Sequence, residues 1–323
     1  MKKVGIIGGS GYTGGELIRL VLQHPALELE FVYSTTRAGK PLTHAHPDLL
    51  GSTTRKFTDQ VNPEIDVVYL CLGHGNSVAF LQEHSFSDHT LIVDLGNDFR
   101  LKEDANFEGR NFVYGLPELQ REAIEKANAI ANPGCFATAL QLAMLPLAKN
   151  NNLKSDVHAH ATTGSTGAGV GLSSTSHFSW RNNNFSWYKP FTHQHLGEIH
   201  QSLEQLHSSP KIHFLPHRGD FTRGIFATVY TEYEGSLAEA QSLFHDFYKT
   251  HPFTHVSKEE ISLKSVINSN NCFLHLHKHE NLLLITSILD NLIKGASGQA
   301  LQNTNLIMGW EETLGLQLKA SIF

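Results

Sequence analysis

A cysteine at the start of an apolar segment is the most reactive group in the sequence. Residues 132–135 read Asn-Pro-Gly-Cys, and the apolar run at 139–145 predicts a helix. The proline and glycine set a sharp entry, so Cys135 is expected at or near the helix N-terminus. The partial positive charge there stabilises a thiolate, the reactive form of cysteine. Cys135 is therefore a candidate nucleophile, although its position alone leaves a buried, unreactive cysteine equally open.

A thiolate that attacks a carbonyl group also needs a partner that carries protons. His217 stands out among the 21 histidines because it follows a predicted strand at 212–215 and leads into a glycine-containing loop. That loop also carries Arg218 and Arg223. Its composition suits a site that binds an anionic substrate and moves a proton, and the alternative is a solvated basic loop.

Glycines at positions 8, 11 and 14 form a Gly-x-x-Gly-x-x-Gly turn close to the N-terminus. The turn lies between a predicted strand at 4–7 and a predicted helix at 16–22, which is the context of a dinucleotide-binding turn. Glycine lets the backbone turn tightly and approach a pyrophosphate, and the helix N-terminus presents its N–H groups to the phosphates. A merely structural turn is the alternative.

The end of the second predicted strand, at 27–33, indicates which dinucleotide binds. An NAD-binding chain usually has an Asp or Glu there, which holds the ribose 2′-hydroxyl. Here Ser34, two threonines and Arg37 follow the strand, and Glu28 and Glu30 lie earlier, within it. Hydroxyl groups and an arginine suit a 2′-phosphate, so NADP is favoured over NAD. Alternatively, Arg37 is a solvated loop charge.

The elements that must position these residues divide the sequence into two halves. Apolar strand patterns at 4–7, 27–33, 66–72 and 91–95 alternate with helices, which predicts an α/β domain with a doubly wound, Rossmann-type parallel sheet. Alternating segments at 157–162, 212–215, 224–233, 272–278 and 282–287, with a helix at 236–250, predict an α+β domain with a largely antiparallel or mixed sheet. The segment from 291 to about 309 is again expected to be helical.

The composition excludes several classes of function. With 323 residues the chain is long enough for two domains, and the net charge of −6 gives no basic patch for nucleic acid. No membrane span or signal peptide is predicted. Three cysteines do not make a disulfide framework, and Cys71 and Cys272 are expected in core strands. A reduced cytoplasmic protein fits these features.

The excess of histidine raises the question of a metal site. His275, His277 and His279 alternate, so a strand would place them on one face, where zinc binding is conceivable. No paired cysteines or carboxylates accompany them, and no His-Glu-x-x-His motif occurs. Surface and core histidines are the preferred interpretation, and no metal is predicted.

Taken together, the motifs resemble those of the N-acetyl-gamma-glutamyl-phosphate reductases of arginine biosynthesis, relatives of aspartate-semialdehyde dehydrogenase. The motifs occur in family order over nearly the whole chain: Gly-Tyr-Thr-Gly-Gly-Glu-Leu at 11–17, Asp-Leu-Gly-Asn-Asp-Phe-Arg-Leu at 94–101, Tyr-Gly-Leu-Pro-Glu at 114–118, Asn-Pro-Gly-Cys at 132–135, Pro-His at 216–217, Thr-Arg-Gly-Ile at 222–225 and Lys-Gly-Ala-Ser-Gly-Gln-Ala at 294–300.

The resemblance implies a role for each matching residue. Cys135 matches the family's nucleophile and His217 its acid/base. The resemblance therefore implies an NADP-dependent reduction of the acyl phosphate to a semialdehyde through a cysteine thioester. The substrate-binding candidates are Arg223, His195, Glu198 and Ser165. The cofactor-binding candidates are Gly8, Ser10, Gly11, Tyr12, Thr13, Gly14, Ser34, Arg37, Gly73, Asn291, Lys294 and Gly298.

The resemblance also implies how the domains and subunits are arranged. Residues 1–132 and 294–323 form the NADP-binding domain, and residues 133–293 form the catalytic, substrate-binding and oligomerisation domain. A homodimer or homotetramer is expected, with a small-molecule substrate and neither nucleic acid nor membrane as a partner.

Some positions depart from the family pattern and leave alternatives for the substrate. Phe136-Ala137 replaces Tyr-Pro, Val170 stands where arginine is common, and residues 218–221 replace an apolar stretch. An N-succinyl-glutamyl or N-acyl-aminoadipyl phosphate therefore stays open as the substrate. In aspartate-semialdehyde dehydrogenases the arginine precedes the histidine, whereas His217 precedes Arg223, which favours the glutamyl branch. A non-catalytic NADP sensor is disfavoured because all three chemical groups are present.

Overall fold

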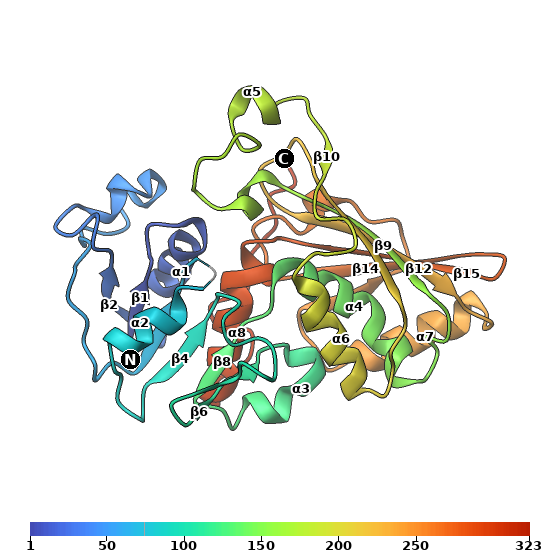
Figure 1. Cartoon of the computed structure of the whole chain (residues 1–323), viewed down its shortest axis with the longest axis horizontal. Helices are drawn as coiled ribbons and strands as arrows, with labels where there is room; N and C mark the ends of the chain where they lie inside the picture. The colour runs from blue at the N-terminus through green and yellow to red at the C-terminus, as the bar shows by residue number, and fades with distance from the viewer. Residues whose placement is uncertain (74) are drawn as a thin grey trace. The chain divides into compact units, whose positions relative to one another are not determined.

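The computed structural model describes residues 1–73 and 75–323, which form two compact units (Figure 1). Unit 1 comprises residues 1–116, 120–133 and 296–317, and unit 2 comprises residues 117–119, 134–295 and 318–323. Helix α3 (Pro117–Ile124) passes from one unit to the other, with non-helical backbone at Gln120. Among the described residues, no helix is long and apolar enough to cross a bilayer.

Unit 1 is built on a six-stranded sheet with the order β2-β1-β3-β4-β8-β7, in which every pair of neighbours is parallel. The prediction of a parallel sheet is confirmed. Its principal elements are β1 (Lys2–Ile7), α1 (Tyr12–Gln23), β2 (Leu27–Tyr33), β3 (Val67–Leu70), α2 (Ser77–Glu83), β4 (Leu91–Asp94), β7 (Val113–Tyr114), β8 (Ala129–Ala131) and α8 (Gly298–Ile307). The short strands β5 (Asn106–Phe107) and β6 (Arg110–Asn111) pair separately, and Leu42–His44 and Pro47–Leu49 form 3-10 turns.

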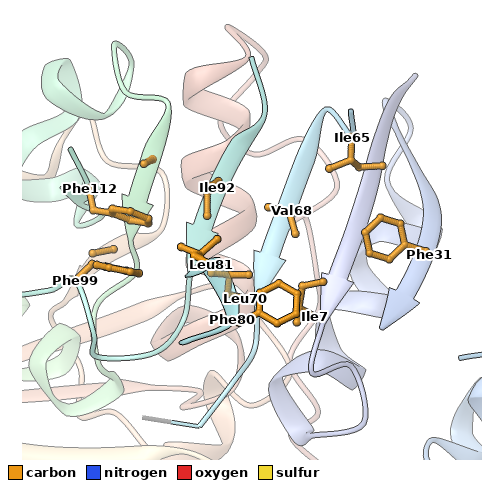
Figure 2. Close-up of a cluster of buried hydrophobic side chains, with 12 residues drawn as sticks. Ile7, Phe31, Ile65, Val68, Leu70, Phe80, Leu81, Ile92, Phe99 and Phe112 are labelled. Carbon is orange, nitrogen blue, oxygen red and sulfur yellow. The ribbon is translucent and has the colours of Figure 1, made fainter. Parts of the chain in front are cut away.

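Helices cover both faces of this sheet. On one face, Val68 and Leu70 of β3 belong to a buried cluster that includes Phe80 and Leu81 of α2 (Figure 2). On the other face, Tyr69 donates or accepts a 2.7 Å hydrogen bond with Thr304 of α8. Strands buried on both sides explain the continuous apolar runs in the sequence.

Unit 2 contains a seven-stranded mixed sheet with the order β10-β11-β9-β12-β15-β14-β13, as predicted for the second half. Its strands are β9 (Val157–Thr163), β10 (Ser186–Trp187), β11 (Ile212–Arg218), β12 (Ile225–Glu232), β13 (Thr254–Ser257), β14 (Cys272–His279) and β15 (Leu282–Leu289). Its helices are α4 (Cys135–Lys149), α5 (Phe178–Arg181), α6 (His195–Gln205) and α7 (Leu237–Tyr248), with 3-10 turns at Ser165–Ala168 and Leu263–Ser265. A π-helical turn at Ile293–Ser297 begins in unit 2 and ends in unit 1.

The sheet of unit 2 buries one face against helices and leaves the other half-buried. Burial alternates along β9, β11 and β12, and α4 packs against β12 and β15 with α6 and α7 beside it. Strand β11 is longer than predicted: His217 and Arg218, expected in a loop, continue the strand opposite Thr162 and Thr163 of β9. Pro216 has no N–H group to donate, but its carbonyl oxygen still accepts a hydrogen bond from the Tyr188 N–H at 3.1 Å.

Candidate active site

Cys135 is the first residue of α4, the position that the sequence predicted. The preceding Gly134 has extended backbone, with φ −69° and ψ 149°, and its carbonyl oxygen accepts from the Thr138 N–H at 2.8 Å. No acidic side chain lies in the first helical turn. The thiol therefore lies at the positive end of a 15-residue helix, where a thiolate is stabilised.

Two buried side chains from α6 hold this helix entry. Glu198, which is 3% exposed, accepts a 2.9 Å hydrogen bond at Oε2 from the Gly134 N–H. The His195 ring lies so close to Gly134 that an added Cβ there would be 2.3 Å from Nε2, and Nε2 lies 3.9 Å from Glu198 Oε1. Both residues were predicted to bind substrate, and the structure places them against the backbone that positions Cys135.

The π-helical turn at Ile293–Ser297 forms a wall beside the nucleophile. A Cβ added to Gly295 would lie 2.8 Å from the Cβ of Cys135. The Gly295 N–H donates to the carbonyl oxygen of Asp290 at 2.9 Å, which fixes the turn. Any larger residue at 295 would push into Cys135, so the approach of the two backbones requires glycine.

His217 lies on the half-buried face of the sheet, within a series of stacked rings. Its ring stacks on Phe185 at 5.0 Å and, more loosely, on His160 at 6.2 Å. Burial, and secondly the charge of His160, lower the pKa of His217 below its usual 6.5. The imidazole is therefore mainly neutral at pH 7, the form that accepts a proton.

Tyr188 is a residue near the nucleophile that the sequence reasoning missed. It follows β10, and the Arg218 guanidinium lies 4.6 Å from the centre of its ring. Burial, and secondly the charge of Cys135, raise the pKa of Tyr188 to about 12, so its hydroxyl stays protonated. No sequence motif marks this tyrosine, because only pairing of β10 with β11 brings it to this place.

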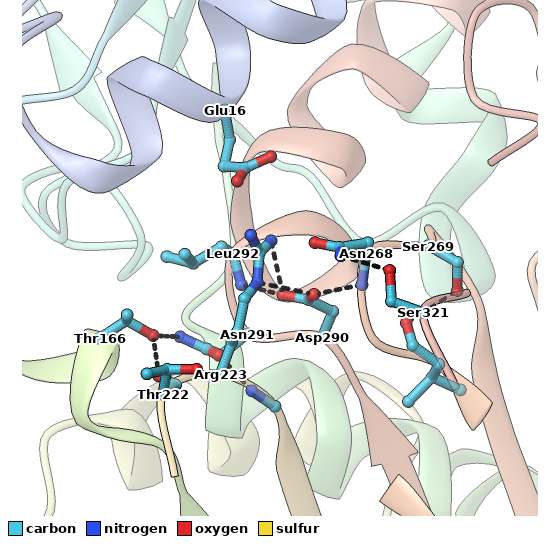
Figure 3. A network of polar contacts seen from close by, with 12 residues as sticks. Glu16, Thr166, Thr222, Arg223, Asn268, Ser269, Asp290, Asn291, Leu292 and Ser321 are labelled. Atoms are coloured by element: carbon cyan, nitrogen blue, oxygen red, sulfur yellow. Dashed lines mark hydrogen bonds and ion pairs between the residues drawn. The ribbon is translucent and has the colours of Figure 1, made fainter. Parts of the chain in front are cut away.

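Arg223 lies in the loop between β11 and β12, where Asp290 and Asn291 hold the loop (Figure 3). Its Nε and Nη2 donate to the Asp290 carboxylate at 3.0 and 3.2 Å. Asn291 accepts from the Gly224 N–H at 2.6 Å and donates to Thr166 Oγ1 at 3.1 Å. Ser165, a predicted substrate residue, is fixed to the same loop through its N–H, which donates to the Phe221 carbonyl at 2.8 Å. Asn291, predicted as a cofactor residue, thus bonds to loops of unit 2.

The glycine turn of unit 1 is shaped for a dinucleotide. Gly8 has a positive φ of 74°, and a Cβ on it would lie 2.5 Å from the Cys71 carbonyl oxygen. A Cβ on Gly14 would lie 2.6 Å from the Cα of Gly9. Gly11 precedes α1 with no side-chain cap, and the first turn, which contains Tyr12 and Thr13, has no acidic residue. A pyrophosphate therefore fits this helix end sterically and electrostatically.

The last helix approaches this turn from the C-terminal part of the chain. Ser297 Oγ donates to the Thr13 carbonyl at 2.9 Å, and Gly298 is the first residue of α8. Gly73 lies after β3, and its carbonyl oxygen accepts from Asn76 at 2.9 Å. Both glycines lie in unit 1 with the glycine turn, as their prediction as cofactor residues requires.

Lys294 occupies a different environment from the one its predicted role requires. Its side chain is fully buried in unit 2, and Nζ donates to Glu118 Oε1 at 2.8 Å. Thr254 donates to the same oxygen at 2.9 Å. Lys294 and Glu118 therefore form a buried ion pair. The ammonium group has no exposed surface for a nucleotide, so this placement argues against a cofactor contact.

Ser34 and Arg37 follow β2, at the edge where a ribose phosphate is expected. Ser34 is 7% exposed and lies 3.5 Å from the Thr36 hydroxyl, and the Arg37 guanidinium is 3.1 Å from His44 Nδ1. Glu30 is engaged elsewhere, by Lys3 at 2.9 Å and Asn62 at 2.6 Å. Its carboxylate is therefore not presented at this edge, and the charges suit a 2′-phosphate.

Within the described ranges, 1–73 and 75–323, no three His, Cys, Asp or Glu side chains are grouped so that they could hold a metal ion. His275 and His277 lie on β14, and the rings of His158 and His213 stack on one another at 4.8 Å. No disulfide links Cys71, Cys135 and Cys272 to one another.

Comparison with known proteins agrees with both halves of the structure. Residues 3–127 match the family model described as "Semialdehyde dehydrogenase, NAD binding domain". Residues 135–291 match the model described as "Semialdehyde dehydrogenase, dimerisation domain". The two matches divide the chain close to Cys135.

Curated relatives match over the full length. N-acetyl-gamma-glutamyl-phosphate reductases of Flavobacterium johnsoniae, Christiangramia forsetii and Parabacteroides distasonis are 60%, 57% and 52% identical to this chain, with complete coverage of both sequences.

Solved structures share the fold at low identity. Aspartate-semialdehyde dehydrogenase II of Vibrio cholerae, complexed with ASA, superposes with a TM-score of 0.70 at 13% identity, over 96% of this chain and 98% of that one. The Candida albicans enzyme with NADP gives 0.69 at 14% identity, over 95% and 98%. The chain therefore belongs to the semialdehyde dehydrogenase family and, within it, to the N-acetyl-gamma-glutamyl-phosphate reductases.

Proposed function

We propose that this chain reduces N-acetyl-gamma-glutamyl phosphate to N-acetyl-glutamate semialdehyde and phosphate, with NADPH as reductant, in arginine biosynthesis. The observation that carries the proposal is the position of Cys135 at the N-terminus of α4. Glu198 accepts a hydrogen bond from the preceding Gly134, and Gly295 packs closely against Cys135. The choice of substrate is supported by the full-length relatives, which are named N-acetyl-gamma-glutamyl-phosphate reductase.

Cys135 acts as the nucleophile in the first step. The thiolate attacks the acyl-phosphate carbonyl carbon, the C–O bond to phosphate breaks, and phosphate leaves with the electron pair. The product is a thioester on Cys135, which keeps the carbonyl activated. The positive helix end favours the thiolate over the thiol.

NADPH, when bound, supplies the hydride that reduces the thioester carbonyl. His217 would take the proton of the Cys135 thiol when the thiolate forms, and would then give this proton to the oxyanion, so that a thiohemiacetal forms on Cys135. Neutral His217 then takes that proton back as the C–S bond breaks, which releases the aldehyde and the Cys135 thiolate. The charge of Cys135 acts on Tyr188, so the protonated Tyr188 hydroxyl and the Arg218 guanidinium, 4.6 Å from the centre of its ring, would add hydrogen-bond donors near the nucleophile.

The residues toward the cofactor are those of the glycine turn in unit 1. Gly8, Ser10, Gly11, Tyr12, Thr13 and Gly14 would hold the pyrophosphate, with Gly73 and Gly298 nearby. Ser34 and Arg37 would bind the 2′-phosphate, because Lys3 and Asn62 hold the carboxylate of Glu30. Arg223 and Ser165 would bind the anionic substrate.

The proposal also includes a location in the cytoplasm and a homo-oligomeric state. Three cysteines that form no disulfide suit the reducing cytoplasm. A homodimer or homotetramer is supported by the description of the matched model for residues 135–291 as a dimerisation domain.

The central test is replacement of Cys135 by serine. Turnover of N-acetyl-gamma-glutamyl phosphate should vanish, while NADPH affinity, measured by fluorescence titration, should stay near that of the wild type. Cys272→Ser is the matched control and should keep its activity, because Cys272 lies on β14 with its sulfur 3.5 Å from Ser287 Oγ. Substantial turnover by Cys135→Ser would contradict covalent catalysis.

A further inference from the structure

Asp290 is a fully buried carboxylate that the reaction scheme does not use. It follows β15, and both of its oxygens accept two hydrogen bonds (Figure 3). Oδ2 accepts from Arg223 Nε at 3.0 Å and from the Asn268 N–H at 2.7 Å. Oδ1 accepts from Arg223 Nη2 at 3.2 Å and from the Leu292 N–H at 2.8 Å. A carboxylate that accepts four hydrogen bonds holds its partners rigidly.

The bond to Arg223 is bidentate, which fixes orientation as well as distance. A planar guanidinium held through Nε and Nη2 cannot rotate about its long axis without breaking two charge-assisted bonds. Its side chain stays 18% exposed, whereas that of Asp290 is 0% exposed. A fully buried carboxylate therefore fixes a guanidinium that is itself only partly exposed.

The same residue also holds the wall beside the nucleophile. The Asp290 carbonyl oxygen accepts from the Gly295 N–H at 2.9 Å, and Gly295 packs against the Cβ of Cys135. The neighbouring Asn291 accepts from the Gly224 N–H at 2.6 Å, which ties down the residue after Arg223. One turn after β15 thus sets both the Arg223 loop and the backbone next to Cys135.

From these contacts we infer that Asp290 is a positioning residue for the reaction: it orients Arg223 so that the guanidinium binds an oxyanion of the substrate beside Cys135. The inference rests on the proposed function and deepens it. The oxyanion is either the transferred phosphate or a carboxylate of the acyl group, since both match the guanidinium chemically.

The test is the reverse reaction, which takes N-acetyl-glutamate semialdehyde, inorganic phosphate and NADP as substrates with separate KM values. Asp290→Asn keeps the shape and loses the charge. It should lower kcat/KM by about 10- to 100-fold, because loss of orientation costs rate in this range. A raised KM for phosphate assigns Arg223 to phosphate, a raised KM for the semialdehyde assigns it to the carboxylate, and the KM for NADP should not change.

A double-mutant cycle separates positioning from a general structural role. If Asp290 acts through Arg223, Asp290→Asn should add little, within about 3-fold, to the loss caused by Arg223→Gln. Multiplicative losses, a raised KM for NADP alone, or wild-type kinetics of Asp290→Asn would overturn the inference. Asp156→Asn, a matched change at an aspartate that pairs with His213, should leave all three KM values unchanged.

A second variant and the activity of the wild type serve as controls for this test. If Asp290→Asn does not fold, Arg223→Lys keeps the positive charge but cannot make the bidentate contact, and wild-type KM values for both anions would then overturn the inference. If the wild-type protein itself does not turn over the semialdehyde with phosphate, the proposed function fails. If the wild type is active and the Asp290→Asn variant is equally active, the positioning role is wrong but the proposed function stands.

Discussion

His217 has its pKa set by its neighbours rather than by its own chemistry. Burial among stacked rings disfavours the imidazolium, and the charge of His160 at 6.2 Å disfavours it further. A pKa below the ordinary 6.5 means that His217 is already neutral at pH 7 and gains its proton only on acidification. This favours proton acceptance in the oxidative direction, when the thiohemiacetal proton must be removed.

We therefore expect the acidic limb of kcat/KM for semialdehyde oxidation to inflect below pH 6.5, the ordinary value. His217→Asn should remove this limb and lower the rate about 10²- to 10⁴-fold. His160→Gln removes one cause of the shift, so the limb should move toward higher pH.

His213→Asn is the control for both variants, because His213 lies on the same strand and pairs with Asp156 at 2.8 Å. An unchanged rate for His217→Asn, or a limb above pH 6.5 in the wild type, would remove His217 from the acid/base role.

At the scale of elements, the entry to α4 depends on a close contact with α6. The backbone at Gly134 is one that any residue adopts, with φ −69°. Only the His195 ring, which would lie 2.3 Å from an added Cβ, excludes a side chain there. The restriction is therefore steric and comes from another helix.

Gly134→Ala should destabilise the protein by about 1–3 kcal/mol, the usual cost of overpacking a filled site. Thermal melting followed by circular dichroism measures this, and Gly134→Ala/His195→Ala should regain part of the lost stability because the clash is gone. Gly171→Ala, with no atom within 4 Å of its added Cβ, should melt like the wild type. Equal melting of Gly134→Ala and wild type would show that the His195 contact is not tight.

At the scale of the whole molecule, unit 1 depends on the C-terminal part of the chain. Asn303 of α8 donates to the Gly115 carbonyl at 2.9 Å, Thr304 bonds Tyr69 at 2.7 Å, and Asn305 bonds His24 at 3.1 Å. These buried polar partners would be left unsatisfied without α8, and each such loss costs roughly 1–3 kcal/mol.

Truncation after residue 295 should therefore abolish NADPH binding in a fluorescence titration, although the glycine turn at 8–14 is intact. Deletion of residues 318–323 is the control. It removes few contacts, among them the Ser321 N–H bond to Ile267 at 2.9 Å, and should leave the affinity nearly unchanged. Normal NADPH binding by the longer truncation would show that unit 1 folds without α8.

The sequence by itself determined the elements and the chemistry of the motifs. Local patterns sufficed for the strand at Leu27–Tyr33, for Cys135 at the start of a helix and for the glycine turn, because periodicity, caps and breakers act within a few residues. Full-length motif order sufficed for the family, which the relatives confirm.

Only the tertiary structure decided which side chains meet. It placed His195 and Glu198 against Gly134, turned Lys294 inward to Glu118 and joined Arg223 to Asp290, 67 positions away along the chain. It also extended β11 through His217, because pairing with β9 and β10 stabilises strand backbone that the local sequence does not mark. Contacts between distant segments depend on sheet order and helix packing, and no local pattern encodes either.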